Sequence, residues 1–208
     1  MMALAMTAPG FPAAPTPPAE LDRATLERAR ALDPAALRAF VARYERPVFA
    51  LLSRMLGPGP HVEDLAQETF LRAVRALPAF QPDGAARVST WLLTIATRLV
   101  LDARKKRRLP LVALDDARTE AVPDPATPET ERARRELGCR IARAAAELGD
   151  DQRAAFLLVD VHGFSIAEVA RALSIPENTA KTRLFRARQH MRERLASDAP
   201  DGEDHERA

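Results

Sequence analysis

The stretch from Ser165 to Leu195 constrains the fold more than any other part of the chain. Ser165 is followed three residues later by Glu168, which is the pattern of a capping box at a helix N-terminus. Pro176 ends that helix, because proline lacks a backbone donor and disfavours helical geometry in the residue before it. A second, longer helix is predicted from Glu177. Steps of four and three residues give this helix an apolar inner stripe that comprises Ala180, Leu184, Ala187, Met191 and Leu195.

The opposite face of the second helix carries polar, basic and aromatic side chains near its start. They are Asn178, Lys181, Thr182, Phe185, Arg186 and Gln189, and four further arginines follow at Arg183, Arg188, Arg192 and Arg194. In a helix-turn-helix, this part of the second helix enters the major groove of DNA, where such side chains pair with bases and phosphates. The alternative is a solvated, Arg-rich helix in an ordinary bundle. An exposed aromatic residue among basic ones favours DNA binding.

The composition limits the class of protein. The chain has 208 residues, enough for one or two domains, and 47% of them are hydrophobic, so an entirely disordered protein is excluded. The single cysteine, Cys139, excludes an internal disulfide, is typical of a reducing cytoplasm, and is expected on a helix. No apolar run approaches the ~18–20 residues of a membrane span. The N-terminus lacks the pattern of a signal peptide, so none is expected.

Changes in composition predict five segments and an all-α fold. Residues 1–20, rich in alanine and proline, are expected to form a disordered tail. Two small helical domains are expected at residues 21–108 and 137–196, because no sustained strand alternation is present. Between them, residues 109–136 are acidic and proline-rich, which is typical of a flexible linker. Residues 197–208 are expected to form a flexible acidic tail.

The first predicted domain begins with clear helix signals. Asp33 followed by Pro34 indicates a cap and a first helical residue. Pro47 is expected to interrupt the helix, with a second helix continuing to Leu56. The following helix carries a polar stripe opposite its apolar face, and the stripe comprises Asp64, Gln67, Glu68 and Arg75. Such a stripe is usually a solvated face; the functional alternative is a docking surface for a basic partner.

A further helix is predicted from Thr90, with Trp91 on its buried side, and it ends in a basic run. The basic residues are Arg98, Arg104, Lys105, Lys106, Arg107 and Arg108. Cations at a helix C-terminus interact favourably with the macrodipole, which is the simplest explanation. Six positive charges against the single carboxylate of Asp102 exceed that role, so contact with a polyanion is the preferred interpretation.

Two blocks of the sequence resemble a known family. EDLAQETFLRAVRALPAF, followed by STWLLTIATRLVLDARKKRR, resembles the second region of bacterial sigma factors. LGDDQRAAFLLVDVHGFSIAEVARALSIPENTAKTRLFRARQHMRERL resembles their fourth region. With a short linker in place of the third region, the chain is similar to the extracytoplasmic-function (ECF) group of the sigma-70-like family. The resemblance covers residues 35–108 and 137–196.

The resemblance implies a mechanism and assigns roles to individual residues. The first domain is expected to bind the β′ clamp coiled-coil of core RNA polymerase through Asp64, Gln67 and Glu68. The same domain is expected to bind the promoter −10 element and assist melting, through Trp91, Arg98, Arg104, Lys105 and Lys106. The second domain is expected to read the −35 element through Asn178, Lys181, Thr182, Phe185 and Arg186. Residues 109–136 would lie in the polymerase channel that later holds RNA.

Partners and alternatives follow from the same interpretation. An anti-sigma factor is an expected partner. The chain is expected in the cytoplasm, either at the nucleoid or held at the inner membrane by the anti-sigma factor. The main alternative is a one-component helix-turn-helix regulator that acts without polymerase, which leaves the polar stripe without a purpose. An enzyme is not expected, because no nucleophile motif, phosphate loop or metal-ligand spacing is present. No catalytic residue, metal or cofactor is therefore predicted.

Overall fold

The structure, a computed structural model, describes residues 20–84, 86–106, 138 and 140–197. Every regular element within these ranges is a helix, which confirms the predicted all-α class. The first half contains α1 (Arg23–Arg30), α2 (Pro34–Leu56), α3 (Pro60–Ala76), the 3-10 turn η1 (Leu77–Ala79) and α4 (Val88–Lys105). The second half contains a helix at residues 140–146, then α6 (Asp150–Phe156), the π-helix η2 (Leu157–Val161), α7 (Ile166–Leu173) and α8 (Glu177–Ser197).

Helix α2 begins as the sequence predicts but does not stop where expected. The Asp33 side chain accepts a hydrogen bond from the backbone N–H of Ala36 at 2.9 Å, and Pro34 occupies the first turn. The predicted interruption at Pro47 is wrong, because α2 continues through this residue to Leu56. Fully buried side chains on both sides of Pro47, among them Tyr44 and Val48, pack into the same core. Their burial outweighs the cost of roughly 3 kcal/mol for an interior proline.

Glu20, which the sequence assigns to the tail, contacts the first domain. The hydroxyl of Tyr44 donates to the Glu20 carboxylate at 2.8 Å and accepts from the backbone N–H of Leu21 at 3.0 Å. The Ser89 side chain also donates to this carboxylate. Burial raises the pKa of Tyr44, so its hydroxyl stays protonated and available as a donor. These contacts fix the start of α4 against α2. Residues 1–19, the linker at 109–136, Cys139 and the tail from 198 lie outside the described residues.

The second half contains the predicted helix pair. The backbone N–H of Glu168 donates to the Ser165 hydroxyl at 3.2 Å, and the N–H of Ser165 donates to the Glu168 carboxylate at 2.7 Å, which confirms the capping box. Helix α7 ends at Leu173, and its C-cap residue Ser174 adopts a left-handed conformation with φ 55°. Helix α8 then begins at Glu177 as predicted. Its apolar stripe is buried from Ala180 to Met191, and Leu195 is half-buried.

The helical segment before this pair has two parts. Residues 150–156 form α6, and residues 157–161 continue it as the π-helix η2. The hydrogen-bonding pattern therefore changes after Phe156. Gly163, with φ 69°, then turns the chain toward α7.

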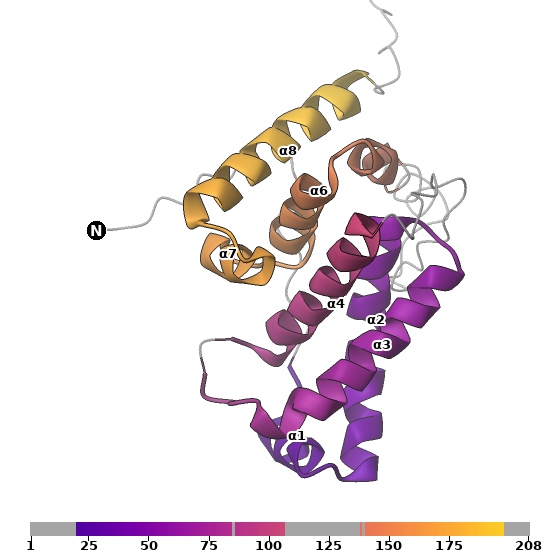
Figure 1. The fold of residues 1–208 in the computed structure, drawn as a ribbon, viewed down its shortest axis with the longest axis vertical. Helices are drawn as coiled ribbons and strands as arrows, with labels where there is room; N and C mark the ends of the chain where they lie inside the picture. The colour runs from indigo at the N-terminus through magenta and orange to yellow at the C-terminus, as the bar shows by residue number, and fades with distance from the viewer. Residues whose placement is uncertain (1–19, 85, 107–137, 139, 198–208) are drawn as a thin grey trace, which may run out of the picture.

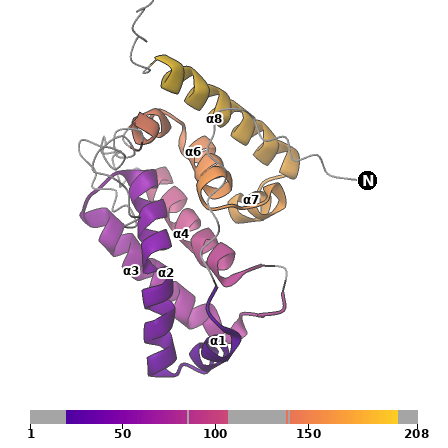
Figure 2. The same ribbon diagram turned by 180° about the vertical axis from the view of Figure 1, so that it is seen from behind.

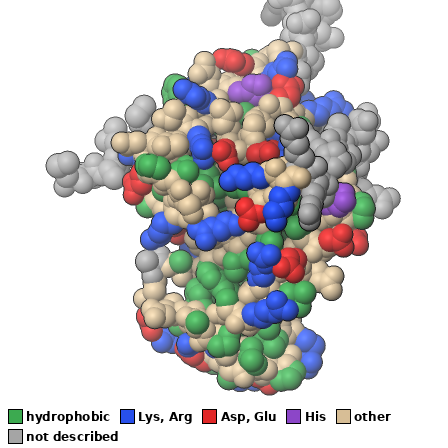
Figure 3. All heavy atoms as spheres, viewed as in Figure 1, with side chains coloured by type: hydrophobic (Ala, Val, Ile, Leu, Met, Phe, Trp, Pro, Cys, Tyr) green, Lys and Arg blue, Asp and Glu red, His purple; other side chains and the backbone are tan. Residues whose placement is uncertain are grey.

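The two halves pack against each other. Figures 1 and 2 show α6 and α7 between the outer helix α8 and the helices α2 and α4 of the first half. Buried side chains from both halves form one continuous hydrophobic cluster. On the face shown in Figure 3, Lys and Arg side chains gather across the band where the halves meet. Within the described ranges, no helix has the length and apolar character needed to cross a membrane.

Candidate nucleic-acid interface

The face of α8 that the sequence assigns to DNA is exposed. Each of its five candidate side chains, Asn178, Lys181, Thr182, Phe185 and Arg186, is exposed to solvent. Phe185 is 62% exposed, the largest exposed fraction among the exposed large hydrophobic residues of the described chain. The Thr182 hydroxyl donates to the backbone carbonyl of Asn178 at 2.9 Å. This bond does not involve the side-chain amide of Asn178. Because the opposite stripe is buried, these side chains form one outward face in the first turns of α8.

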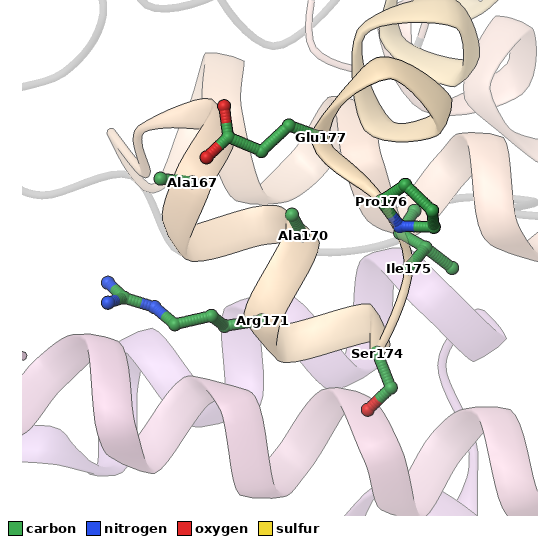
Figure 4. Close-up of a pocket in the computed structure, with 7 residues that line it drawn as sticks. All are labelled: Ala167, Ala170, Arg171, Ser174, Ile175, Pro176 and Glu177. Atoms are coloured by element: carbon green, nitrogen blue, oxygen red, sulfur yellow. The ribbon is translucent and has the colours of Figure 1, made fainter.

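The turn before α8 is also accessible. Figure 4 shows a surface groove along the end of α7 and the turn, lined by Ala167, Ala170, Arg171, Ser174, Ile175, Pro176 and Glu177. Arg171, Ser174, Pro176 and Glu177 are exposed. The start of α8 is therefore not covered by other described parts of the chain.

Three of the four flanking arginines on α8 are engaged in ion pairs. Arg188 makes two hydrogen bonds to Asp160, at 2.6 and 3.0 Å, and these bonds raise its pKa. Arg183 pairs with Asp151 at 2.9 Å, and Arg194 pairs with Glu147 at 2.5 Å. The sequence assigns all of them to phosphates, and that assignment stays a prediction. In the structure, their ion pairs connect α8 to α6, to η2 and to Glu147, which follows the 140–146 helix.

The polar stripe on α3 forms an accessible surface. Asp64, Gln67 and Arg75 are exposed, and Glu68 is half-buried with an ion pair to Arg72 at 2.6 Å. Leu71, 46% exposed, lies on the same face, one turn beyond Gln67 and Glu68. The sequence does not single out Leu71, because an apolar residue in an amphipathic helix is normally assigned to the core. The surface therefore combines carboxylates, an amide and one apolar side chain.

The start of α4 packs on Phe80, and the loop between Phe80 and α4 is bonded to α1. Trp91 is half-buried, and its ring lies 5.0 Å from that of Phe80 at an interplanar angle of 45°. Asp83 in the loop accepts two hydrogen bonds from Arg23, at 2.8 and 2.9 Å, and these bonds lower the pKa of the carboxyl group. Lys105 and Lys106 at the other end of α4 are exposed. The candidate −10 residues are thus spread along α4, with Trp91 near its start, Arg98 in its interior and the other basic residues at its C-terminal end.

Two basic residues of α4 are engaged by the second half of the chain. Arg98 donates to the carbonyl oxygens of Ala172 at 2.9 Å and Arg171 at 2.7 Å, and more weakly to the Ser174 hydroxyl at 3.4 Å. Arg104, whose side chain is 17% exposed, forms an ion pair with Asp150 at 2.5 Å. The sequence predicts both arginines as DNA ligands and gives no sign of these intramolecular partners, which are distant along the chain.

Comparison with known proteins identifies the family. The family models "Sigma-70 region 2" and "Sigma-70, region 4" match residues 40–109 and 140–191. The chain is 32% identical over 176 residues to the ECF RNA polymerase sigma-E factor of Escherichia coli strain K12, covering 81% of this chain and 91% of that protein. It is 34% identical over 160 residues to the ECF sigma factor SigW of Bacillus subtilis, covering 73% and 84%.

The chain belongs to the ECF group of the sigma-70 family. This sigma factor directs promoter-specific initiation of transcription, and family membership favours that function over a one-component regulator. Among solved structures, CnrH in complex with the cytosolic domain of CnrY is 27% identical, with a TM-score of 0.59 over 86% of this chain and 99% of that one. The sigma factor RpoE of Bartonella quintana shares the fold, with 20% identity, a TM-score of 0.60 and coverage of 77% and 97%.

Two buried ionisable side chains of this sigma factor lie where its halves meet. Arg153 is 1% exposed and bonds four backbone carbonyls, one of which, on Met55, belongs to the first half. Burial lowers the pKa of Arg153 to about 10. Burial and the charge of Arg54 lower the pKa of His162 to about 4, so this imidazole is neutral at pH 7. Among the described residues, no group of His, Cys, Asp and Glu side chains could hold a metal ion.

Proposed function

We propose that the outward face of α8 reads the promoter −35 element. The observation that carries this proposal is the exposure of Asn178, Lys181, Thr182, Phe185 and Arg186 on a helix whose opposite face is buried. Amide and basic side chains provide the donors and acceptors that distinguish base pairs in the major groove, and Phe185 can contact a thymine methyl. The ion pairs of Arg183 and Arg188 with the same half fix the orientation of this face.

We infer that the polar stripe on α3 binds the β′ clamp coiled-coil of core polymerase. Asp64 and Gln67 are exposed, while Glu68 is oriented by Arg72. A surface of acidic and amide side chains is complementary to a basic partner, and such complementarity provides specificity and rate of association. Leu71, at the same face, supplies the apolar area that a stable protein contact needs.

We also propose that α4 binds the −10 element during promoter melting. Trp91 offers an aromatic surface for an unstacked base, and Arg98, Arg104, Lys105 and Lys106 supply cations for the strand. Extruding a base costs a few kcal/mol of stacking, which these contacts offset. The domain boundaries at 21–108 and 137–196 are part of this proposal, because they separate the −10 and −35 functions.

A regulatory partner and a location complete the proposal. CnrH, which is similar to this chain, was solved in complex with the cytosolic domain of CnrY. We propose that a protein of the anti-sigma class binds this chain in the same way. The sigma factor then acts in the cytoplasm, at the nucleoid when it transcribes and at the inner membrane when such a partner holds it there.

Run-off transcription with purified core polymerase tests the function directly. The wild-type chain is expected to produce discrete start sites on genomic templates with no inhibitor present. The double variant Asp64→Lys with Glu68→Lys is expected to lose core binding, because two carboxylates facing a basic partner become cations. Glu45→Lys with Glu193→Lys makes the same charge change at exposed positions of α2 and α8 and serves as control.

Two results would overturn the proposal. If the Asp64→Lys, Glu68→Lys variant co-purifies with core at wild-type yield, the polar stripe on α3 is not the docking surface. If the wild-type chain confers no promoter selectivity on core polymerase, the assigned DNA contacts are wrong as well.

A further inference from the structure

The N-terminus of α4 receives its capping group from outside the helix. Within the described part of this segment, Arg87 at the N-cap position makes no side-chain capping bond, and the first turn holds no acidic residue. The Glu20 carboxylate lies there instead: it accepts a hydrogen bond from the backbone N–H of Ser89 at 3.3 Å and another from the Ser89 hydroxyl. A carboxylate at a helix N-terminus satisfies free N–H groups and interacts favourably with the helix dipole. Glu20 therefore acts as an N-cap from 69 residues away in the sequence.

Helix α2 sets the position of this carboxylate. The Tyr44 hydroxyl donates to the Glu20 Oε2 atom, which also accepts the Ser89 N–H, and it accepts the N–H of Leu21. Tyr44 is fully buried and Ser89 is 5% exposed, so the core of the first half holds both partners although Glu20 itself is exposed. Figures 1 and 2 place the segment before α1 beside the start of α4. Glu20 thus connects this segment, α2 and the first turn of α4.

The first turn of α4 carries Trp91. The backbone N–H of Trp91 donates to the Arg87 carbonyl at 3.0 Å, so this residue closes the turn that Glu20 caps. The indole ring is half-buried and lies 5.0 Å from the ring of Phe80. Because helix ends fray when their N–H groups lack partners, the orientation of the indole is expected to depend on the cap.

A second contact connects the loop before α4 to α1, but it is more exposed. Arg23 and Asp83 form two hydrogen bonds, and their side chains are 67% and 74% exposed. Exposed ion pairs contribute little, because water and salt screen them. Glu20, whose partners are buried, is therefore expected to control the start of α4 more strongly than Arg23 does.

We propose that Glu20 is a positioning residue for the −10 interaction. Its carboxylate holds the first turn of α4, and with it Trp91, in the orientation that receives an unpaired base. This inference rests on the proposed role of α4 in promoter melting. It extends that role to a residue that the sequence assigns to the N-terminal tail and that acts through Ser89 rather than by contact with DNA.

Glu20→Ala and Glu27→Ala form a matched pair of variants. The first removes the cap of α4, whereas the second removes the same side chain from α1, where Glu27 pairs with Arg30 at 2.7 Å. Glu20→Gln keeps an oxygen acceptor without the charge and is expected to recover part of the wild-type behaviour. Tyr44→Phe is an independent variant, because it removes the donor that orients Glu20 and leaves both Glu20 and α4 unaltered.

Two measurements on the free full-length chain report the first turn of α4 without DNA. Trp91 is the only tryptophan in the chain, so fluorescence emission reports its surroundings directly. Glu20→Ala is expected to shift this emission to the red. Hydrogen exchange of the segment from Ser89 to Trp91 is expected to accelerate by about threefold to thirtyfold, the range that loss of an N-cap produces. Glu27→Ala is expected to match the wild type, and circular dichroism verifies that each variant is folded.

Permanganate footprinting of the holoenzyme measures the open complex, on a promoter fragment that gives a discrete wild-type start site. Glu20→Ala and Tyr44→Phe are expected to lower the fraction of open promoter by about threefold or more. Core binding and occupancy of the upstream element are expected to stay unchanged, because the surfaces on α3 and α8 are not altered. A role of Glu20 in overall stability alone would lower all three quantities together and would count against positioning.

Trp91→Ala separates this inference from the proposed function. If Trp91→Ala lowers open-complex formation and Glu20→Ala does not, Glu20 is not a positioning residue. Unchanged emission and exchange in Glu20→Ala, or equal changes in Glu27→Ala, would also overturn the inference. If Trp91→Ala itself leaves open-complex formation unchanged, the proposed role of α4 fails and the positioning role fails with it, whereas the exchange data judge the capping contact alone.

Discussion

Replacing Arg153 tests how the second half is held together. This side chain extends from α6 and donates to the carbonyl oxygens of Ala145 at 2.7 Å, Ala146 at 2.5 Å and Leu148 at 2.8 Å. It also donates to the carbonyl of Met55 at 2.9 Å. Carbonyls at the end of a helix lack intrahelical donors, so a buried guanidinium satisfies several of them together. Arg153→Met retains much of the side-chain volume but removes every donor.

The expected loss of stability in Arg153→Met is the balance between the hydrogen bonds removed and the cost of charge burial avoided. A hydrogen bond to a charged group contributes about 1.5–3 kcal/mol, and Arg153 makes four such bonds. Burying the charge of Arg153 has a cost, which is also why burial lowers its pKa. The methionine side chain avoids this cost and packs as an apolar group. The net loss is expected to be about 3–5 kcal/mol, because buried carbonyls left without partners dominate. This is a large share of the ~5–15 kcal/mol that stabilises a typical domain.

Urea denaturation followed by far-UV circular dichroism measures this loss in the full-length chain. Arg143→Met is the control, because Arg143 is exposed on the 140–146 helix. The control is expected to change the free energy of unfolding by less than about 0.5 kcal/mol. If Arg153→Met loses less than about 1 kcal/mol relative to this control, its four bonds do not carry the stability assigned to them.

Three further predictions concern a cap, a buried histidine and the proposed recognition face. Ser165→Ala is expected to lower the free energy of unfolding by about 1 kcal/mol through loss of the capping box, and an unchanged melting temperature would contradict this. The pKa of His162 is about 4 in the folded chain against about 6.5 in the unfolded chain. The neutral buried imidazole therefore contributes fully to the free energy of unfolding above about pH 6.5, and this contribution is lost as the pH falls toward about 4. His162→Leu is therefore expected to be less sensitive to pH than the wild type in this window by up to about 3 kcal/mol; parallel unfolding curves would refute this. Lys181→Ala or Arg186→Ala is expected to weaken binding of the holoenzyme to the −35 element by about 1–3 kcal/mol, and footprinting that shows unchanged promoter occupancy for both would disprove the base contacts.

Local signals in the sequence were sufficient for most helix ends. The capping box at Ser165 and the Asp33 cap both lie where the sequence predicts them. The stripe from Ala180 to Met191 is also buried as predicted. These signals succeed because a cap, a turn or an apolar period involves residues within a few positions of one another, whose geometry the backbone itself dictates.

The prediction for Pro47 fails for the complementary reason. Proline in a helix interior does carry a local cost, but the buried neighbours that keep α2 helical through Pro47 are a property of the whole bundle. Leu71 was missed in the same way, because periodicity alone does not show which apolar residues remain exposed.

The amino-acid sequence by itself determined the helical class, the family and the outward face of α8, because each is encoded in patterns of neighbouring residues. Only the tertiary structure decided how the arginines are used. It assigns Arg183 and Arg188 to ion pairs within one half, and Arg98 and Arg104 to contacts between the halves. A guanidinium has the same charge wherever it lies, and its partner is chosen by the folded chain, which brings together carboxylates and carbonyls from distant positions.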